Sequence, residues 1–214
     1  SAVGRSRCVV TLGVMLAGRN GLSPVMVGRS AHLDRLRLAL DGGGVALVTG
    51  EAGIGKSRLV RELLSTQDDR LVLAGQAEVG GLGHPFALFV EAVSEHTDPD
   101  DPRVQRLQAT GEVTLPLRDR YRLARELLDE AAGSRPVLVV FEDLHWADSE
   151  SIALFEGLAG DPDHQLAALG SYRPGDLTRR HPLAEVLPRI ERRVDVAHVR
   201  LTRFSVDEVA TFLT

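Results

Sequence analysis

The sequence predicts a three-layer α/β fold, in which helices cover both faces of a central, mostly parallel five-stranded sheet. Three observations lead to this prediction. Short apolar runs alternate along the chain with amphipathic segments, the pattern of a parallel sheet with crossover helices. Most of these runs lack polar alternation, as expected of strands buried on both faces. The chain has 214 residues, of which 43% are hydrophobic and 26% charged, and this suits one large globular domain.

The individual elements follow from these runs and from helix caps. We expect the strands at Val45–Thr49, Leu71–Gly75, Val137–Phe141, Gln165–Gly170 and Val194–Val199. We expect helices at Ser30–Leu40, Lys56–Ser65, Leu117–Ala132, Ser149–Leu158, Leu183–Arg193 and Ser205–Leu213. Asp148 is a favourable N-cap, Ser205 and Glu208 form a capping box, and Pro188 should kink or split its helix. The stretch His96–Leu115 has no regular period and is expected to be a surface loop or insertion.

Composition excludes several classes of protein. The 25 Lys and Arg against 30 Asp and Glu give a net charge of −5, which argues against a chain that coats nucleic acid. The single cysteine, Cys8, cannot form an internal disulfide and suits the cytoplasm. The apolar run Cys8–Ala17 faintly resembles a signal peptide, but it is shorter than the ~20 residues that span a bilayer. We interpret residues 1–26 as an N-terminal arm or an artificial extension, and we expect no membrane association.

A glycine-rich segment between the first strand and its helix is the strongest motif. It matches GxxxxGK[ST] at every fixed position: Gly50, Glu51, Ala52, Gly53, Ile54, Gly55, Lys56 and Ser57. In such a phosphate loop, backbone N–H groups and the helix N-terminus surround phosphates, the lysine reaches the β- and γ-phosphates, and the hydroxyl binds Mg²⁺. We expect these residues and the following Arg58 to contact ATP or ADP. Lys56 is also the only lysine, since the other 24 basic residues are arginine.

Two adjacent carboxylates, the acid pair Glu142 and Asp143, follow the apolar run Val137–Phe141. In open α/β sheets, ligands bind at the carboxyl ends of the strands. A phosphate loop needs an acid at such a strand end to hold Mg²⁺, and a second acid can polarise the attacking water. We assign Glu142 to the metal and Asp143 to the base.

The segment Glu142–Asp148 resembles the "DDLHWAD/EDLHWAD" signature of bacterial signal-transduction ATPases of the STAND class, which are relatives of the AAA+ ATPases. The similarity is strongest to the ATPase domain of large LuxR-type transcriptional regulators and to ATPase modules attached to adenylate cyclases and kinases. Three further segments resemble elements of that family and extend the likeness from Val27 to Thr214: Val27–Arg29 ("GRxxELxxL"), Ser171–Pro174 ("TYRP") and Leu201–Ser205 ("LxPLs").

The resemblance implies roles for individual residues. Val27, Gly28 and Arg29 would lie against the adenine, although Arg29 could equally be a surface arginine. Arg173 would approach the γ-phosphate, distinguish ATP from ADP and stabilise charge during transfer. We expect His145 beside Trp146 to be a packing residue rather than a catalytic one.

In AAA+ relatives, an arginine that acts across a subunit boundary can come from the region of Arg189, Arg192 and Arg193. We favour a solvated helix end for these three residues, because cations suit a helix C-terminus.

The expected function is that of a switch domain that binds ATP with Mg²⁺ and hydrolyses it slowly, within a LuxR-type regulator. Alternatives are a non-hydrolysing oligomerisation or interaction module, the ATPase module of a cyclase- or kinase-linked regulator, or, least favoured, a small-molecule phosphotransferase. We interpret 27–214 as the nucleotide-binding domain of a longer protein, cut before a winged-helix lid. DNA binding would belong to that missing C-terminal part, and self-association could depend on nucleotide.

Overall fold

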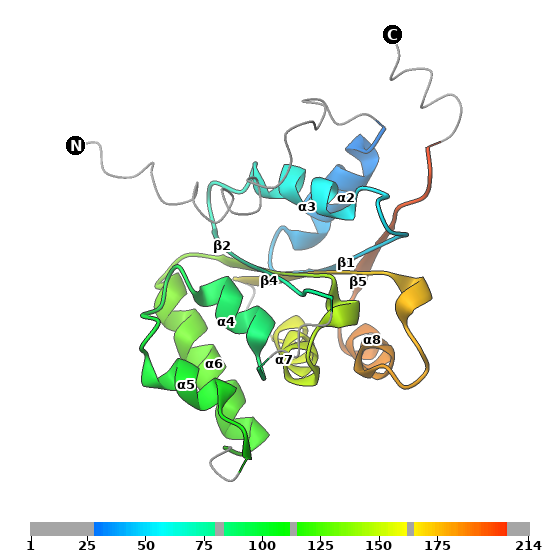
Figure 1. The fold of residues 1–214 in the computed structure, drawn as a ribbon. Helices are drawn as coiled ribbons and strands as arrows, with labels where there is room; N and C mark the ends of the chain where they lie inside the picture. The colour runs from blue at the N-terminus through cyan, green and yellow to red at the C-terminus, as the bar shows by residue number, and fades with distance from the viewer. Residues whose placement is uncertain (1–27, 80–83, 112–114, 162–164, 205–214) are drawn as a thin grey trace, which may run out of the picture.

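Five parallel strands form one sheet through the middle of the molecule (Figure 1). The structure is a computed structural model that describes residues 28–79, 84–111, 115–161 and 165–204. The strands lie in the order β2-β3-β4-β1-β5, and every pairing is parallel. Their bounds are Val45–Thr49 (β1), Leu71–Gln76 (β2), Val137–Glu142 (β3), Leu166–Tyr172 (β4) and Val196–Arg200 (β5). The predicted five-stranded sheet is therefore confirmed.

The register places the carboxyl ends of the strands at one edge of the sheet. Gln76 pairs with Glu142, so β2 and β3 end together. Thr49 pairs with Tyr172 on one side and with Arg200 on the other, so β1, β4 and β5 also end together. The residues that follow these strands therefore meet along the same edge, although β4 separates β1 from β3.

Helices cover both faces of the sheet, as Figure 1 shows. Among the described residues, α2 (Ser30–Leu40) and α3 (Lys56–Leu64) cover one face; on the other lie α4 (Ala87–Val93), α5 (Pro102–Gln108), α6 (Leu117–Ala132), α7 (Ser149–Ala159) and α8 (Pro182–Arg193). Two short 3₁₀ turns follow β3 and β4, namely η2 (Leu144–Trp146) and η3 (Pro174–Asp176).

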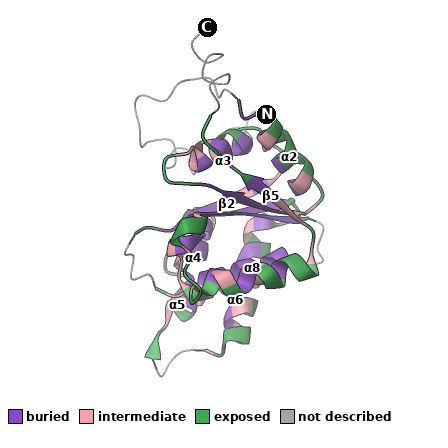
Figure 2. Ribbon diagram, turned by 90° about the vertical axis from the view of Figure 1, so that its right-hand side faces the viewer, coloured by how far each residue is buried: buried purple, intermediate pink, exposed green. Residues whose placement is uncertain are grey.

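Alternate residues of each strand supply the two apolar layers. On β1, Ala46 and Val48 pack with α2 and α3, whereas Val45 and Leu47 belong to the layer under α4 to α8. The sheet is accordingly buried on both faces, and Figure 2 shows exposure confined mainly to the outer helix faces and loops. Of the described residues, none lies in a helix with the length and apolarity needed to cross a membrane.

The expectation of a loop over His96–Leu115 is wrong for its central part, which contains helix α5. The Asp101 side chain caps α5 by accepting from the backbone N–H of Arg103, and Pro102 occupies the first turn. Val104 and Leu107, three residues apart, are buried. Helix α4 was not predicted either.

Other bounds differ by one or two residues. Strand β4 runs on to Tyr172, and β5 begins at Val196 and is partly exposed as an edge strand. Helix α8 is not split, since Pro188 lies inside it on the exposed side. Asp148 caps α7 as predicted. The arm over residues 1–26 and the predicted helix Ser205–Leu213 lie outside the described residues.

Candidate functional site

The phosphate loop, Gly50–Ser57, connects the end of β1 to the start of α3. Gly53 and Gly55 have φ values of 70° and 100°, in the left-handed region where a side chain would strain the backbone. Glu51, Ala52 and Gly53 are exposed, while Ile54, Ser57 and Arg58 are half-buried. The sharp turn at these glycines lets α3 begin directly behind the loop, with its N-terminal N–H groups at the sheet edge.

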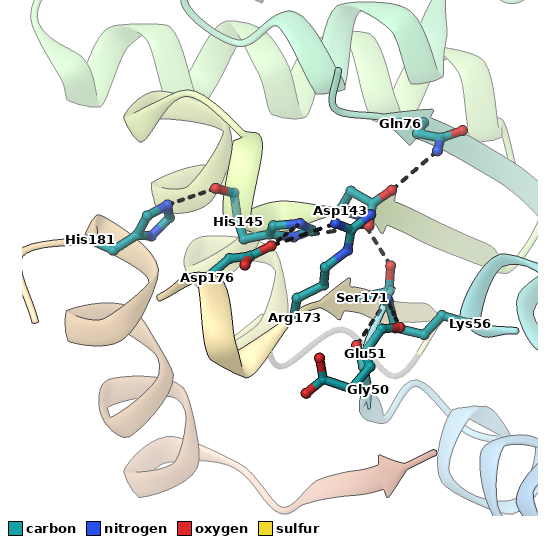
Figure 3. Close-up of polar contacts among 10 residues, drawn as sticks. All are labelled: Gly50, Glu51, Lys56, Gln76, Asp143, His145, Ser171, Arg173, Asp176 and His181. Carbon is teal, nitrogen blue, oxygen red and sulfur yellow. Dashed lines mark hydrogen bonds and ion pairs between the residues drawn. The ribbon is translucent and has the colours of Figure 1, made fainter. Parts of the chain in front are cut away.

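Lys56 lies folded into this loop. Its ammonium donates to the carbonyl oxygens of Gly50 at 3.0 Å and Glu51 at 3.2 Å (Figure 3). Burial lowers the pKa of Lys56, and the nearby charge of Arg173 lowers it further, while Asp143 and Glu142 oppose the shift. A buried cation beside a row of backbone N–H groups favours an anionic ligand.

Glu142 ends β3 and is almost fully buried. The Ser57 hydroxyl donates to its carboxylate, and burial raises its pKa, with the charge of Asp143 adding to the shift. Among the described residues, its Oε2 atom has no hydrogen-bond partner. A buried carboxylate oxygen without a donor, beside a hydroxyl, fits a hard divalent cation such as Mg²⁺.

Asp143 is held by three polar contacts. Its backbone N–H donates to Ser171 Oγ at 3.1 Å, its Oδ2 accepts from Gln76 Nε2 at 3.2 Å, and its carbonyl accepts from Trp146 N at 2.8 Å. Its φ of 56° is an uncommon value for a residue other than glycine, and it starts the η2 turn. Sequence reasoning missed Gln76 and named Ser171 only as part of the segment Ser171–Pro174, although both are polar residues at the ends of apolar strands.

Arg173 follows β4 and opens the turn Arg173–Asp176, which we name the sensor turn after the role that the resemblance implies for Arg173. Its guanidinium lies 4.6 Å from the centroid of the Trp146 ring, and its Nη1 is 3.6 Å from Asp176 Oδ2. Figure 3 shows the Arg173 side chain pointing toward Asp143. Its influence on the pKa of Lys56 agrees with this position.

Arg29 is only 5% exposed, which excludes the alternative of a surface arginine. Its Nη2 donates to the carbonyl of Thr202 at 2.6 Å, and its guanidinium lies 4.3 Å from the centroid of the Phe204 ring. Arg29 therefore joins the segment before α2 to the segment after β5. Gly28 is exposed with a φ of 69°, and Val27 lies outside the described residues.

Arg189 pairs with Glu156 of α7 through contacts of 2.8 Å and 2.9 Å, on the surface of α8. Arg192 and Arg193 are exposed at the end of this helix. These positions agree with the interpretation of a solvated helix end.

A phosphate loop after β1, an acid pair after the non-adjacent β3 and an arginine after the intervening β4 define a P-loop nucleotide-binding ATPase module. The particular family is equally plain. The chain belongs to the AAA ATPase domain family, whose model matches residues 25–169, more than half of the sequence.

One curated relative is an uncharacterised protein of Rhizobium meliloti (strain 1021), 27% identical over 166 residues. This similarity covers 59% of the chain but only 16% of the relative, so the chain spans less than a fifth of that protein's length.

Solved structures share the fold. The Walker-type ATPase of Pyrococcus abyssi has a TM-score of 0.55 at 17% identity, over 88% of this chain and 57% of that one. A STAND protein with a tetratricopeptide repeat sensor from Pyrococcus horikoshii gives 0.51 at 19%, over 88% and 25%. Drosophila ORC bound to GC-rich DNA and Cdc6 gives 0.51 at 10%, over 95% and 62%.

Proposed function

We propose that this chain is the switch domain of a signal-transduction ATPase, which binds ATP with Mg²⁺ and hydrolyses it slowly. We propose further that it belongs to a LuxR-type transcriptional regulator, with residues 27–214 as the nucleotide-binding domain. The family membership supports the first proposal, and the EDLHWAD segment and the sensor turn support the second. DNA binding would belong to another part of the protein, and self-association would depend on the bound nucleotide.

We propose the following roles, which the contacts support. Lys56 and the loop N–H groups would hold the β- and γ-phosphates, and Ser57 with Glu142 would hold Mg²⁺. The metal, when bound, neutralises phosphate charge. Asp143 would orient the attacking water and accept its proton, and Arg173 would stabilise the charge of the transferring phosphate.

One observation carries the proposal: three strand ends bring a buried ammonium, a buried carboxylate pair and a guanidinium to one place. The charges of Asp143, Arg173 and Glu142 affect the pKa of Lys56, although these residues lie far from it in the sequence. A cation and an arginine facing two acids across a glycine-rich loop is the arrangement that phosphoryl transfer needs.

The test compares nucleotide binding with turnover. Isothermal titration calorimetry should detect ATP·Mg²⁺ binding to the wild-type chain and none to Lys56→Ala. Asp143→Asn should bind ATP but release phosphate about 10²-fold more slowly, the lower end of what a general base contributes.

Arg118→Ala is the matched charge control for Lys56→Ala, because Arg118 is exposed on α6, across the sheet from the loop. Full-strength binding by Lys56→Ala would contradict the proposal. A wild type that binds ATP but releases no phosphate would instead identify a nucleotide-binding interaction module.

A further inference from the structure

His145 lies two residues beyond Asp143, in the η2 turn, and its side chain is fully buried at 0% exposure. The turn's backbone is anchored, since the Nε2–H of His181 donates to the His145 carbonyl at 2.9 Å. The imidazole also packs at 4.5 Å, centroid to centroid, from the Trp146 ring. Packing alone would account for this burial if the ring nitrogens faced apolar atoms.

They instead face two carboxylates (Figure 3). His145 Nδ1 is 3.9 Å from Asp143 Oδ1, and Nε2 is 3.5 Å from Asp176 Oδ2. Within the described part of the chain, neither ring nitrogen has a hydrogen-bond partner. Since buried polar atoms are nearly always paired, a ring with both nitrogens unpaired between two acceptors calls for an explanation.

The chemistry of imidazole restricts what this ring can do. Burial lowers the pKa of His145, which favours the neutral ring. A neutral imidazole carries one N–H donor and one lone pair, whereas ionised carboxylates only accept. The ring can therefore satisfy one of the two aspartates, and its lone pair must face the other.

The surroundings decide between the two aspartates. The Asp176 side chain is 47% exposed and forms an ion pair with Arg173, so water and a guanidinium already stabilise its charge. The Asp143 side chain is 9% exposed, and Gln76 serves only its Oδ2. The single N–H of the neutral imidazole therefore stabilises more when it donates to the less hydrated carboxylate, at Oδ1 of Asp143.

We propose that His145 is a positioning residue, whose Nδ1–H donates to Asp143 Oδ1 and, with Gln76 on Oδ2, fixes the carboxylate from both sides. The gap of 3.9 Å closes when the site is loaded, because hydrogen bonds of catalytic groups are often long before the ligand binds. The same ring places Asp143 next to the sensor turn that carries Asp176 and Arg173. This inference rests on the proposed hydrolysis of ATP.

Two amide variants separate the two ring nitrogens. His145→Asn keeps an N–H donor near the Nδ1 position, toward Asp143, and His145→Gln keeps one near Nε2, toward Asp176. We expect His145→Gln to lose about tenfold in kcat with the KM for ATP changed less than about twofold, a smaller loss than that of the base itself. His145→Asn should recover most of the wild-type kcat.

Recovery by Gln equal to or better than that by Asn would overturn the proposal, and so would wild-type kcat in both variants. A parallel loss of thermal stability and ATP affinity in both would show that His145 only packs.

A second measurement needs no variant to be active. Imidazole ¹⁵N NMR spectra of the 214-residue chain report which ring nitrogen carries the proton, and among its 7 histidines the His145 signal is the one absent from His145→Asn. We expect the Nδ1–H tautomer when ATP·Mg²⁺ is bound to the wild-type chain. The Nε2–H tautomer would refute the contact. If the wild-type chain releases no phosphate, the proposed hydrolysis fails, and the tautomer still decides the contact.

Discussion

Among single residues, Lys56 is the one basic position at which the chain has lysine in place of arginine. Arginine fills the other 24 basic positions. At position 56 the ammonium fits between two carbonyls of its own loop, a contact that a compact point charge can make and a planar guanidinium fork cannot reproduce. The single lysine thus lies where geometry, rather than charge alone, selects the residue type.

The lowered pKa of Lys56 gives a prediction for alkaline pH. The ammonium, not the neutral amine, attracts phosphate, and a lowered pKa means that the ammonium deprotonates at lower pH than an ordinary lysine. ATP affinity should therefore weaken as pH rises toward the pKa of Lys56, before the range where exposed lysines titrate. Calorimetric titrations at a series of alkaline pH values measure this.

Lys56→Arg is the control for that titration, because a guanidinium stays charged throughout the range. Its affinity, whatever its absolute value, should lack the alkaline decline. An equal decline in both proteins would assign the effect to another group.

At the scale of elements, β3 and β4 each end in a short turn that places one side chain at the candidate site. Strand β3 passes directly into the η2 turn at Asp143, and β4 reaches η3 through Arg173. The two turns contact each other through Trp146, which lies under the Arg173 guanidinium. A movement of the sensor turn must therefore change the surroundings of this ring.

Trp146 is the only tryptophan, so its fluorescence reports the sensor turn without a label. If the γ-phosphate draws Arg173 from the ring, ATP should change the emission of Asp143→Asn, a variant expected to bind without turnover, more than ADP does. In Arg173→Ala on the same background, the difference between ATP and ADP should disappear, while Arg118→Ala should retain it. Equal responses to both nucleotides would contradict a γ-phosphate sensor at Arg173.

The elements that the sequence predicted well are those whose local signals agree with their burial. Helices α2 and α6 have the predicted bounds, and β1 does too. Helix α4 lies beyond such signals, because it starts after Phe86, a fully buried residue with a φ of 61° whose N–H donates to Asp148 from a distant turn. Helix α5 has a local signal in Asp101 and Pro102, but it is too short to show a clear period.

For the whole molecule, strand order limits what the sequence could predict of the site. Motifs located the phosphate loop, the acid pair and Arg173 without any knowledge of topology. The Gln76 contact with Asp143 depends on the pairing of β2 with β3, and the Arg29 contact with Thr202 joins the segment before α2 to the segment after β5. Neither contact follows from local spacing, because each joins residues that are far apart in the sequence.

This topology predicts that nucleotide stabilises the domain as one unit. The residues that we expect to hold the nucleotide lie at the ends of β1, β3 and β4, three consecutive strands at the centre of the sheet. A nucleotide held by all three opposes separation of these strands. Ligand at 100 times its Kd adds about 2.7 kcal/mol to the free energy of unfolding, which for a domain of this size raises Tm by about 5–10 °C. Differential scanning fluorimetry with ATP·Mg²⁺ measures the shift.

Removing either half of the site should remove this stabilisation selectively. Chelation of Mg²⁺ by EDTA should reduce the Tm shift, because Glu142 and Asp143 then face the phosphates without an intervening cation. Lys56→Ala should lose the shift altogether, whereas Arg118→Ala should keep it. A shift that survives in Lys56→Ala would place the nucleotide away from the phosphate loop, since the loss of a buried ammonium from the binding site cannot leave phosphate affinity unchanged.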